Sequence, residues 1–450
     1  MQIVQRMLSE RVFIILLSPL FITACSATSA LQLELEEESK VEQEYYDSKE
    51  LQYADKIYDD NIKTVLLHIK GSELEAPIIP LSGNEKIILR FDDLDENIRE
   101  MHYSFIHCTW DWKPSDLQIM DYQEGYNNDI IENYDFSFNT VNNYTNYQLE
   151  FPNDRIKLKR SGNYIIRVYA NGNQDDLMLT SRFMVVEPKV SIGATIQPSS
   201  VVSEREYRQE IDIEVNIGSI STMNPYRDIE LVVMQNLRRD NVVTGVKPNF
   251  IKNEQLSYNY QGELDFDGGN EYRFFDAKSL RYRSEEVEEV RLEEGGYHIY
   301  LAPDWAKAFK QYTFENDING KFLVQNDDMI NPHLESDYVF VHFNFPVDAM
   351  FGSGEMYVMG QLSNWDLKKS HRMTYNADNL SYELILKLKQ GYYNYAYLWK
   401  YPKSNSGTFD LTDGNHSETE NDYLILVYFK DQSYFSDRLI GVERANSLGR

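Results

Sequence analysis

The sequence has very little cysteine and, beyond its first two dozen residues, no long apolar run. Only Cys25 and Cys108 are present among 450 residues, so a network of disulfides is excluded and the fold must be stabilised by burial. No later segment approaches the roughly 20 consecutive apolar residues of a membrane-spanning helix. Basic residues are scarce as well, with 44 Lys and Arg against 72 Asp and Glu. The resulting net charge of -28 repels phosphate backbones, which argues against nucleic acid as a partner.

Motifs for catalysis and for cofactors are also missing. There is no Gly-x-Ser-x-Gly nucleophile elbow and no phosphate-binding glycine loop. The loops at 265–270 and 316–320 place oxygens around glycine, but neither supplies the later glutamate of a calcium loop, so hairpin turns are favoured. Carboxylate pairs for glycoside hydrolysis are too numerous in so acidic a chain to discriminate. We therefore expect no cofactor and no metal, and an enzyme ranks third, behind the two binding functions given below.

The neighbours His107 and Cys108 could suggest a nucleophile or a zinc ligand set. They lie on a predicted strand, where successive side chains point to opposite faces, so they cannot act as a pair. The pattern is typical of a buried cysteine beside a half-buried histidine.

The first 24 residues have the features of a targeting signal. Arg6 and Arg11 precede an apolar run, 12–22, that is too short to span a bilayer. The run ends in ITAC, which resembles a bacterial lipobox, so we expect cleavage before Cys25 and lipidation of its thiol. A lipid at this position would anchor the protein to a membrane.

Residues 25–50 are polar and acidic and predict a tether between the lipid and the first domain. Their acids begin only at Glu34, without an acidic run directly behind the cysteine. This spacing favours a lipoprotein of the outer membrane that faces the periplasm.

The rest of the chain reads as short strands separated by turn residues. Three blocks can be separated, 51–190, 191–336 and 337–450. The first holds about seven predicted strands, as an immunoglobulin-like sandwich does; they are 62–69, 86–91, 102–111, 134–142, 144–151, 163–170 and 182–190. In the third block we expect strands at 339–345, 355–360, 381–388, 392–398 and 424–429. The sequence thus predicts an all-β chain of tandem immunoglobulin-like β-sandwiches.

The stretch from Tyr103 to Asn153 is denser in aromatics and asparagines than a core requires. Trp110 and Trp112 would share one face of a strand that ends at Pro114, and Ser115 would cap a short helix. Aromatic anchors beside adaptable amides are typical of protein interfaces. We expect a partner-binding surface made by Trp110, Trp112, Tyr122, Tyr126, Tyr134, Asn139 and Tyr144. Composition alone fits a long Asn-rich loop folded over its own sandwich equally well.

The third block resembles the early-set immunoglobulin-like modules related to glycogen-binding domains. The matching residues are Gly360, Leu362 and Trp365 in a Gly-x-[Phe/Leu]-x-x-Trp corner, and Leu386, Leu388, Gly391, Tyr393 and Tyr395 in the following hairpin. The resemblance implies that Trp365 stands where the family stacks a sugar and that Asn421 matches a polar contact. The family's basic contact, however, falls at Ala396. Carbohydrate binding by an outer-membrane lipoprotein is therefore the alternative function.

From about residue 50 to its C-terminus, the chain resembles the plug proteins of the type IX secretion system. The resemblance is carried by IKTVLLHIKGSELEAPIIPL, HCTWDWKPSDL, GYNNDIIENYDFSFNTVNNYTNYQLEFPN, SGNYIIRVYANGNQDDLMLTSRFMVVE and GGNEYRFFDAKSL. It implies a non-enzymatic role, because members associate with the large outer-membrane β-barrel translocon and occlude its periplasmic opening. The expected partners are thus this translocon and, through the lipid on Cys25, the membrane.

Overall fold

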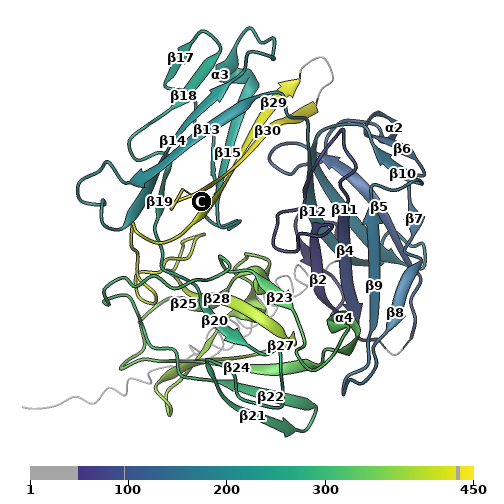
Figure 1. Ribbon diagram of the computed structural model, residues 1–450, viewed down its shortest axis with the longest axis vertical. Helices are drawn as coiled ribbons and strands as arrows, with labels where there is room; N and C mark the ends of the chain where they lie inside the picture. The colour runs from purple at the N-terminus through teal and green to yellow at the C-terminus, as the bar shows by residue number, and fades with distance from the viewer. Residues whose placement is uncertain (1–48, 96, 432–435, 450) are drawn as a thin grey trace, which may run out of the picture. The chain divides into compact units, whose positions relative to one another are not determined.

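The computed structural model describes residues 49–95, 97–431 and 436–449, and these are mostly β-strands in several sheets (Figure 1). The helices among them have a single turn each, α2 (Ile119–Tyr122), α3 (Pro225–Asp228) and α4 (Pro332–Glu335). The predicted all-β sandwich architecture is confirmed. The predicted signal, the lipidation site Cys25 and nearly all of the predicted tether lie outside the described residues.

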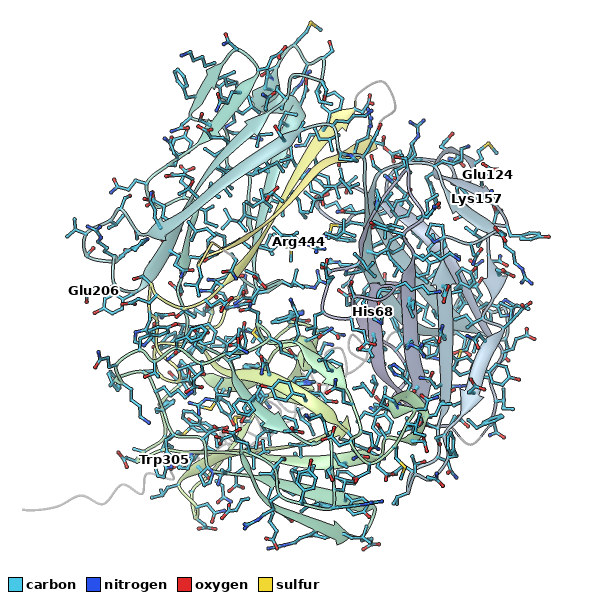
Figure 2. All side chains as sticks on the ribbon, viewed as in Figure 1. His68, Glu124, Lys157, Glu206, Trp305 and Arg444 are labelled. Carbon is cyan, nitrogen blue, oxygen red and sulfur yellow. The ribbon has the colours of Figure 1, made fainter. Side chains whose placement is uncertain are left out.

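The first sandwich is built by strands between residues 56 and 186. One sheet has the order β1 (Lys56–Ile57), β12 (Leu177–Val186), β11 (Gly162–Ala170), β5 (Met101–Cys108), β7 (Asp129–Ile130), with β3 (Ile78–Pro80) beside β12. The other has the order β2 (Ile62–Ile69), β4 (Ile87–Asp93), β9 (Thr145–Phe151), β8 (Asn133–Phe136). Alternating side chains from both sheets form the core, in which Phe105, Phe151 and Phe183 pack with ring centroids 5.0 to 5.5 Å apart. A further pair, β6 (Gln123–Gly125) and β10 (Ile156–Leu158), carries the outward side chains Glu124 and Lys157 (Figure 2).

The second sandwich combines segments that are far apart in the sequence. One sheet has the order β13 (Ser191–Pro198), β14 (Arg208–Asn216), β18 (Gln255–Tyr258), β17 (Phe250–Lys252), with β19 (Asp265–Asp267) on β14. The other has the order β16 (Val243–Thr244), β15 (Ile229–Gln235), β29 (Asp422–Asp431), β30 (Ser436–Asn446). Figure 1 shows the two yellow C-terminal strands beside the teal ones of this sandwich.

The third sandwich takes its strands from residues 273–400. One sheet has the order β20 (Arg273–Asp276), β28 (Gly391–Lys400), β23 (Phe322–Val324), with β25 (Glu355–Met359) on β28. The other has the order β21 (Val287–Glu293), β22 (Gly296–Leu301), β24 (Tyr338–Pro346), β27 (Ser381–Lys389), β26 (Thr374–Asn376). Two 3-10 turns follow β25, η1 (Gln361–Ser363) and η2 (Lys369–His371).

Strand pairing differs from the predicted grouping at the boundary between residues 336 and 337. The strand predicted at 424–429 for the third block is β29, and it pairs with β15 of the second sandwich. Conversely, β20 and β22 of the predicted middle block pair with β28 and β24 of the third sandwich. Periodicity indicates which residues form a strand, but it does not indicate which distant strand pairs with it. The assignment of these strands to the blocks 191–336 and 337–450 was therefore wrong.

A buried ion pair joins the first and third sandwiches. Lys389 Nζ lies 2.6 Å from an Asp92 carboxylate oxygen, and both side chains are 1% exposed. Asp92 also accepts hydrogen bonds from the Tyr338 hydroxyl at 2.6 Å and from Asn146 Nδ2 at 2.7 Å. These donors satisfy the carboxylate, as a buried charge requires.

An apolar contact layer joins the first and second sandwiches. Met184 of β12 packs in one cluster with Met234 of β15 and with Leu426 and Tyr428 of β29. At the rim of this layer Arg444 of β30 forms an ion pair with Glu75 (Figure 2). Both interfaces hold the sandwiches of residues 51–450 together in one compact unit.

Candidate functional site

The predicted strand face carrying Trp110 and Trp112 is not formed. Strand β5 ends at Cys108, and Trp112 has a positive φ of 64° in the turn that follows. The turn is closed by Thr109, whose hydroxyl donates to Asp111 at 2.6 Å. Short-range hydrogen bonds of this kind compete with the strand ladder, which is why the strand stops early.

Both tryptophans contact the chain itself. The backbone N–H of Trp110 donates to Asp437 at 3.0 Å, and Lys430 Nζ lies 5.2 Å from the Trp110 ring centroid. The guanidinium of Arg182 lies 4.5 Å from the Trp112 ring centroid. The predicted anchors therefore belong largely to contacts between the first and second sandwiches.

Tyr122 and Tyr144 are buried, at 5% and 3% exposure. The Tyr122 hydroxyl donates to the Phe105 carbonyl at 3.1 Å, inside the first sandwich. The Tyr144 hydroxyl donates to the Ser336 carbonyl at 2.9 Å, in the segment that enters β24. Two of the predicted surface residues are thus core or interface residues, and the prediction of an exposed surface is wrong for them.

The loop between β8 and β9 docks on the chain as well. The N–H groups of Phe138 and Val141 donate to Leu334 O at 3.1 Å and to Asp337 at 2.6 Å. Asn139 is exposed, with Nδ2 at 3.4 Å from Glu335. For this part of the stretch, the alternative of a loop folded over its own sandwich is also wrong, because the loop contacts the segment that leads into the third sandwich.

Four large apolar side chains of the stretch are exposed, and we call them the β8 surface: Tyr126, Ile130, Tyr134 and Phe136. Their exposures are 63%, 37%, 40% and 55%. Among the strands that the structure describes, β8 pairs only with β9, so its other edge is open there, and all four of its residues are exposed. An open edge strand with exposed apolar side chains is a template for pairing with another chain.

The short helix before the β8 surface begins differently from the prediction. Gln118 is the N-cap of α2, and Asp121 accepts the Gln118 N–H at 2.9 Å. Ser115 was the predicted cap, but its hydroxyl instead lies 2.9 Å from His107 Nδ1.

His107 and Cys108 are both buried, with 1% and 0% exposure. The buried cysteine is confirmed, whereas the histidine is fully and not half buried. Burial raises the pKa of Cys108 to about 12 and lowers the pKa of His107 to about 4. A neutral thiol and a neutral imidazole on opposite faces give no nucleophile.

The residues predicted to bind carbohydrate are buried. Trp365 is 5% exposed, and its ring meets Tyr272 edge-on at 6.4 Å. Asn421 is 3% exposed, and its amide donates to the Gly268 carbonyl at 2.8 Å and to Gln209 at 3.0 Å. Sugar stacking requires an exposed aromatic plane, which this position does not offer.

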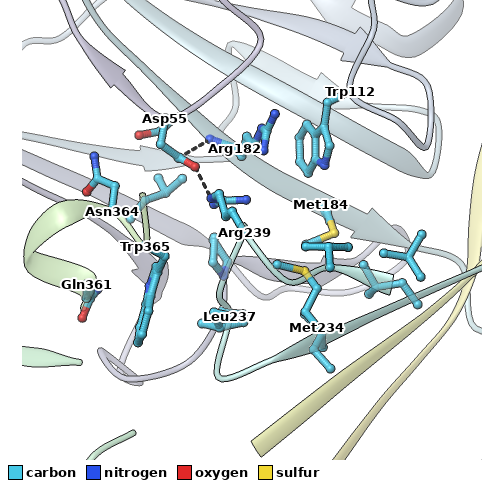
Figure 3. A pocket seen from close by; sticks show the side chains of 18 of the residues that line it. Asp55, Trp112, Arg182, Met184, Met234, Leu237, Arg239, Gln361, Asn364 and Trp365 are labelled. Atoms are coloured by element: carbon cyan, nitrogen blue, oxygen red, sulfur yellow. Dashed lines mark hydrogen bonds and ion pairs between the residues drawn. The ribbon is translucent and has the colours of Figure 1, made fainter. Parts of the chain in front are cut away.

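A cavity between the sandwiches has a volume of about 440 Å³. Residues of all three sandwiches line it, among them Met184, Met234 and Trp365 (Figure 3). Within the described ranges, no group of three or more His, Cys, Asp or Glu is placed to hold a metal ion. Across the same ranges, no helix has the length and apolarity needed to cross a membrane.

Comparison with known proteins gives a match to one family model and matches to solved structures. Residues 62–187, which cover the first sandwich from β2 to the end of β12, match the model of the "Type 9 secretion system plug protein 1st domain". The whole fold is similar to the crystal structure of a hypothetical protein from Parabacteroides merdae ATCC 43184, with 33% identity and a TM-score of 0.85. That match covers 88% of this chain and 100% of the other. No curated protein matches the chain. The chain therefore belongs to the same family as the Parabacteroides merdae protein, and its first sandwich matches the type 9 secretion system plug protein domain.

Proposed function

We propose that the protein is a non-enzymatic component of the type 9 secretion system that binds the outer-membrane β-barrel translocon and occludes its periplasmic opening. The observation that carries this proposal is the match of residues 62–187 to the plug protein domain. It associates the chain with type 9 secretion and therefore with the cell envelope, and the matched family is not an enzyme family. A lipid on Cys25 would hold the protein at the inner face of the outer membrane.

The β8 surface is the part of this domain that we assign to the translocon. It is exposed in the described chain, whereas Trp110, Trp112, Tyr122 and Tyr144 are engaged internally. The Tyr134 ring packs on the buried ring of Tyr147, with the two ring centroids 5.6 Å apart, and this contact restricts its motion. A rigid aromatic side chain loses little conformational entropy on binding, so such residues make effective anchors.

Removal of the β8 surface is expected to reduce recovery of the translocon. The variant Tyr126→Ala, Tyr134→Ala, Phe136→Ala should lower the amount of translocon that co-purifies with the tagged protein by about tenfold or more, since anchors at an interface centre contribute about 2 kcal/mol each. The measurement is a native pull-down from solubilised outer membranes, quantified by mass spectrometry.

A matched control is Tyr207→Ala with Tyr226→Ala, which removes rings of similar exposure, 52% and 48%, from the second sandwich. This control should retain full recovery. Equal recovery with the β8 variant and the control would contradict the assignment of this surface, while no translocon with the unmodified protein would contradict the proposed function itself.

Substitution of Cys25 tests the anchor separately. Cys25→Ser removes the thiol that we propose to be lipidated, and the protein should move from the detergent phase to the aqueous phase in Triton X-114 partitioning. Ser26→Ala leaves the thiol in place and should stay in the detergent phase. Partitioning of Cys25→Ser with the detergent would show that this residue is not the anchor.

A further inference from the structure

The cavity of about 440 Å³ lies where the first, second and third sandwiches meet within residues 51–450. Met184 comes from β12, Met234 from β15 and Leu426 from β29, while Trp365 follows the η1 turn of the third sandwich. Figure 3 shows the two methionines with Leu237 on one side of this space and Trp365 on another. Most of its wall is therefore aliphatic, thioether or aromatic.

The apolar part of this wall is a poor host for water. A buried water needs two to four polar partners, and the volume of this cavity corresponds to about 15 water molecules at about 30 Å³ each. Methionine side chains adapt to the shape of an apolar occupant, because they are unbranched and polarizable. The volume also lies inside the range of roughly 300 to 1,000 Å³ that is usual for small-molecule sites.

One end of the cavity is polar and carries an excess of positive charge. Arg182 and Arg239 approach it with a single carboxylate between them, that of Asp55 (Figure 3). Asp55 forms an ion pair with Arg239 at 2.5 Å, and its other oxygen accepts the backbone N–H of Arg182 at 2.9 Å. The guanidinium of Arg182 donates to the Tyr53 carbonyl at 2.6 and 3.0 Å, so its hydrogen bonds go to a neutral acceptor, while Asp55 and Asp366 act on its charge from a distance.

Further observations show that this end is short of negative charge. The buried Nε of Arg239 has no hydrogen-bond partner. Burial and the neighbouring charge of Arg239 lower the pKa of Arg182 to about 10. The remaining acids of the lining do not compensate it, since Glu75 pairs with Arg444, Asp111 pairs with Lys113, and Glu73 is solvent-exposed.

We propose that the cavity binds a long-chain carboxylic acid, with its alkyl tail against Met184, Met234 and Leu426 and its carboxylate between Arg182 and Arg239. A carboxylate fits the planar donor fork of arginine and would satisfy the unpartnered Nε. An acyl chain attached to Cys25 would have the same apolar tail as a free fatty acid. Its ester or amide linkage, however, carries no negative charge. The positive end therefore favours a free acid as the occupant.

Displacement of a fluorescent fatty acid tests this site. Purified full-length protein is saturated with an undecanoic acid that carries a terminal dansyl group, and lauric acid, dodecanol and dodecylamine compete with it. Lauric acid should displace the dye at least about tenfold more effectively than dodecanol, because charge-assisted hydrogen bonds distinguish the two head groups. Dodecylamine should displace the dye least.

Two kinds of variant test the charged end and the apolar end of the site separately. Arg239→Gln should weaken lauric acid binding about tenfold and leave dodecanol unchanged, while Arg205→Gln, an exposed arginine outside the cavity, should bind as the unmodified protein does. Met234→Trp fills the part of the cavity that would hold the alkyl tail and should abolish dye binding. Val242→Trp should also abolish dye binding, and it disturbs the core less because Val242 is a half-buried residue of the lining. Thermal unfolding of each variant checks that it is folded.

Three results would overturn the proposal. The first is equal competition by lauric acid and dodecanol, and the second is unchanged dye binding when a folded tryptophan variant fills the cavity. The third is binding that appears only in Cys25→Ser, because the protein's own lipid would then be the occupant. Equal binding by Cys25→Ser and by the unmodified protein supports a free acid.

Discussion

Lys389→Met is expected to destabilise the protein by about 3 to 5 kcal/mol, because it leaves the Asp92 carboxylate buried without its cation. Both partners are 1% exposed, so water cannot replace the lost charge. Burial lowers the pKa of Lys389, and the charge of Asp92 acts in the opposite direction. Urea unfolding at neutral pH, followed by tyrosine and tryptophan fluorescence, measures the loss.

The ion pair on the surface of the same sandwich is the control. Lys70 lies 2.7 Å from Glu150, but the two side chains are 53% and 28% exposed, so Lys70→Met should cost about 1 kcal/mol or less. Adding Asp92→Asn to Lys389→Met should recover part of the stability, since the unpaired charge is then absent. Equal losses for Lys389→Met and Lys70→Met would contradict the role of the buried pair.

Acid should destabilise the first sandwich through His107. The Nε2–H of this ring faces the Ser161 carbonyl at 3.3 Å, and Nδ1 lies 2.9 Å from the Ser115 hydroxyl, so the neutral ring is satisfied. Because burial lowers its pKa to about 4, the unfolded chain binds the proton first, at a pKa near 6.5. Stability that is present above pH 6.5 is thus lost between pH 6.5 and about 4, by about 3 kcal/mol at 1.36 kcal/mol per pKa unit.

The variant His107→Gln isolates this contribution, because glutamine keeps a donor and an acceptor but does not titrate. It should be less stable than the unmodified protein at pH 7, and the difference should shrink by about 3 kcal/mol at pH 4. An NMR titration of the folded protein should place the His107 midpoint near 4. A difference in stability that does not change with pH would refute this account.

Local patterns in the sequence predicted the strands well where one face is buried. The range 62–69 was predicted from alternation and coincides with β2. Ile62, Leu67 and Ile69 of this strand pack on the core of the first sandwich, whereas Leu66 packs in the core cluster of the third. Alternation reports a face that is buried by any neighbour, so it works without knowledge of the partner strand. For the same reason it could not show that 424–429 pairs with β15.

The candidate site was harder to predict because exposure depends on distant segments. The Gly-x-Leu-x-x-Trp corner does form, with η1 between Gly360 and Asn364, but segments outside it determine which side of Trp365 is covered. A Cβ at Gly320 would lie 2.7 Å from the indole, so a glycine some 45 residues away lets the ring pack inside. Likewise, composition alone could not distinguish Tyr126, which is exposed, from Tyr144, which contacts the third sandwich.

The return of the chain to the second sandwich has a consequence for biosynthesis. The first sandwich is complete in sequence by Val186, so a growing chain holds all its strands early. The second sandwich lacks β29, which lies between β15 and β30, until the final residues are available. Until then the edge of β15 and the apolar layer around Met234 stay uncovered, and Met184 of the finished first sandwich has no partner. A chain built this way exposes apolar surface until its last 30 residues are available, so we expect it to need chaperone protection until then.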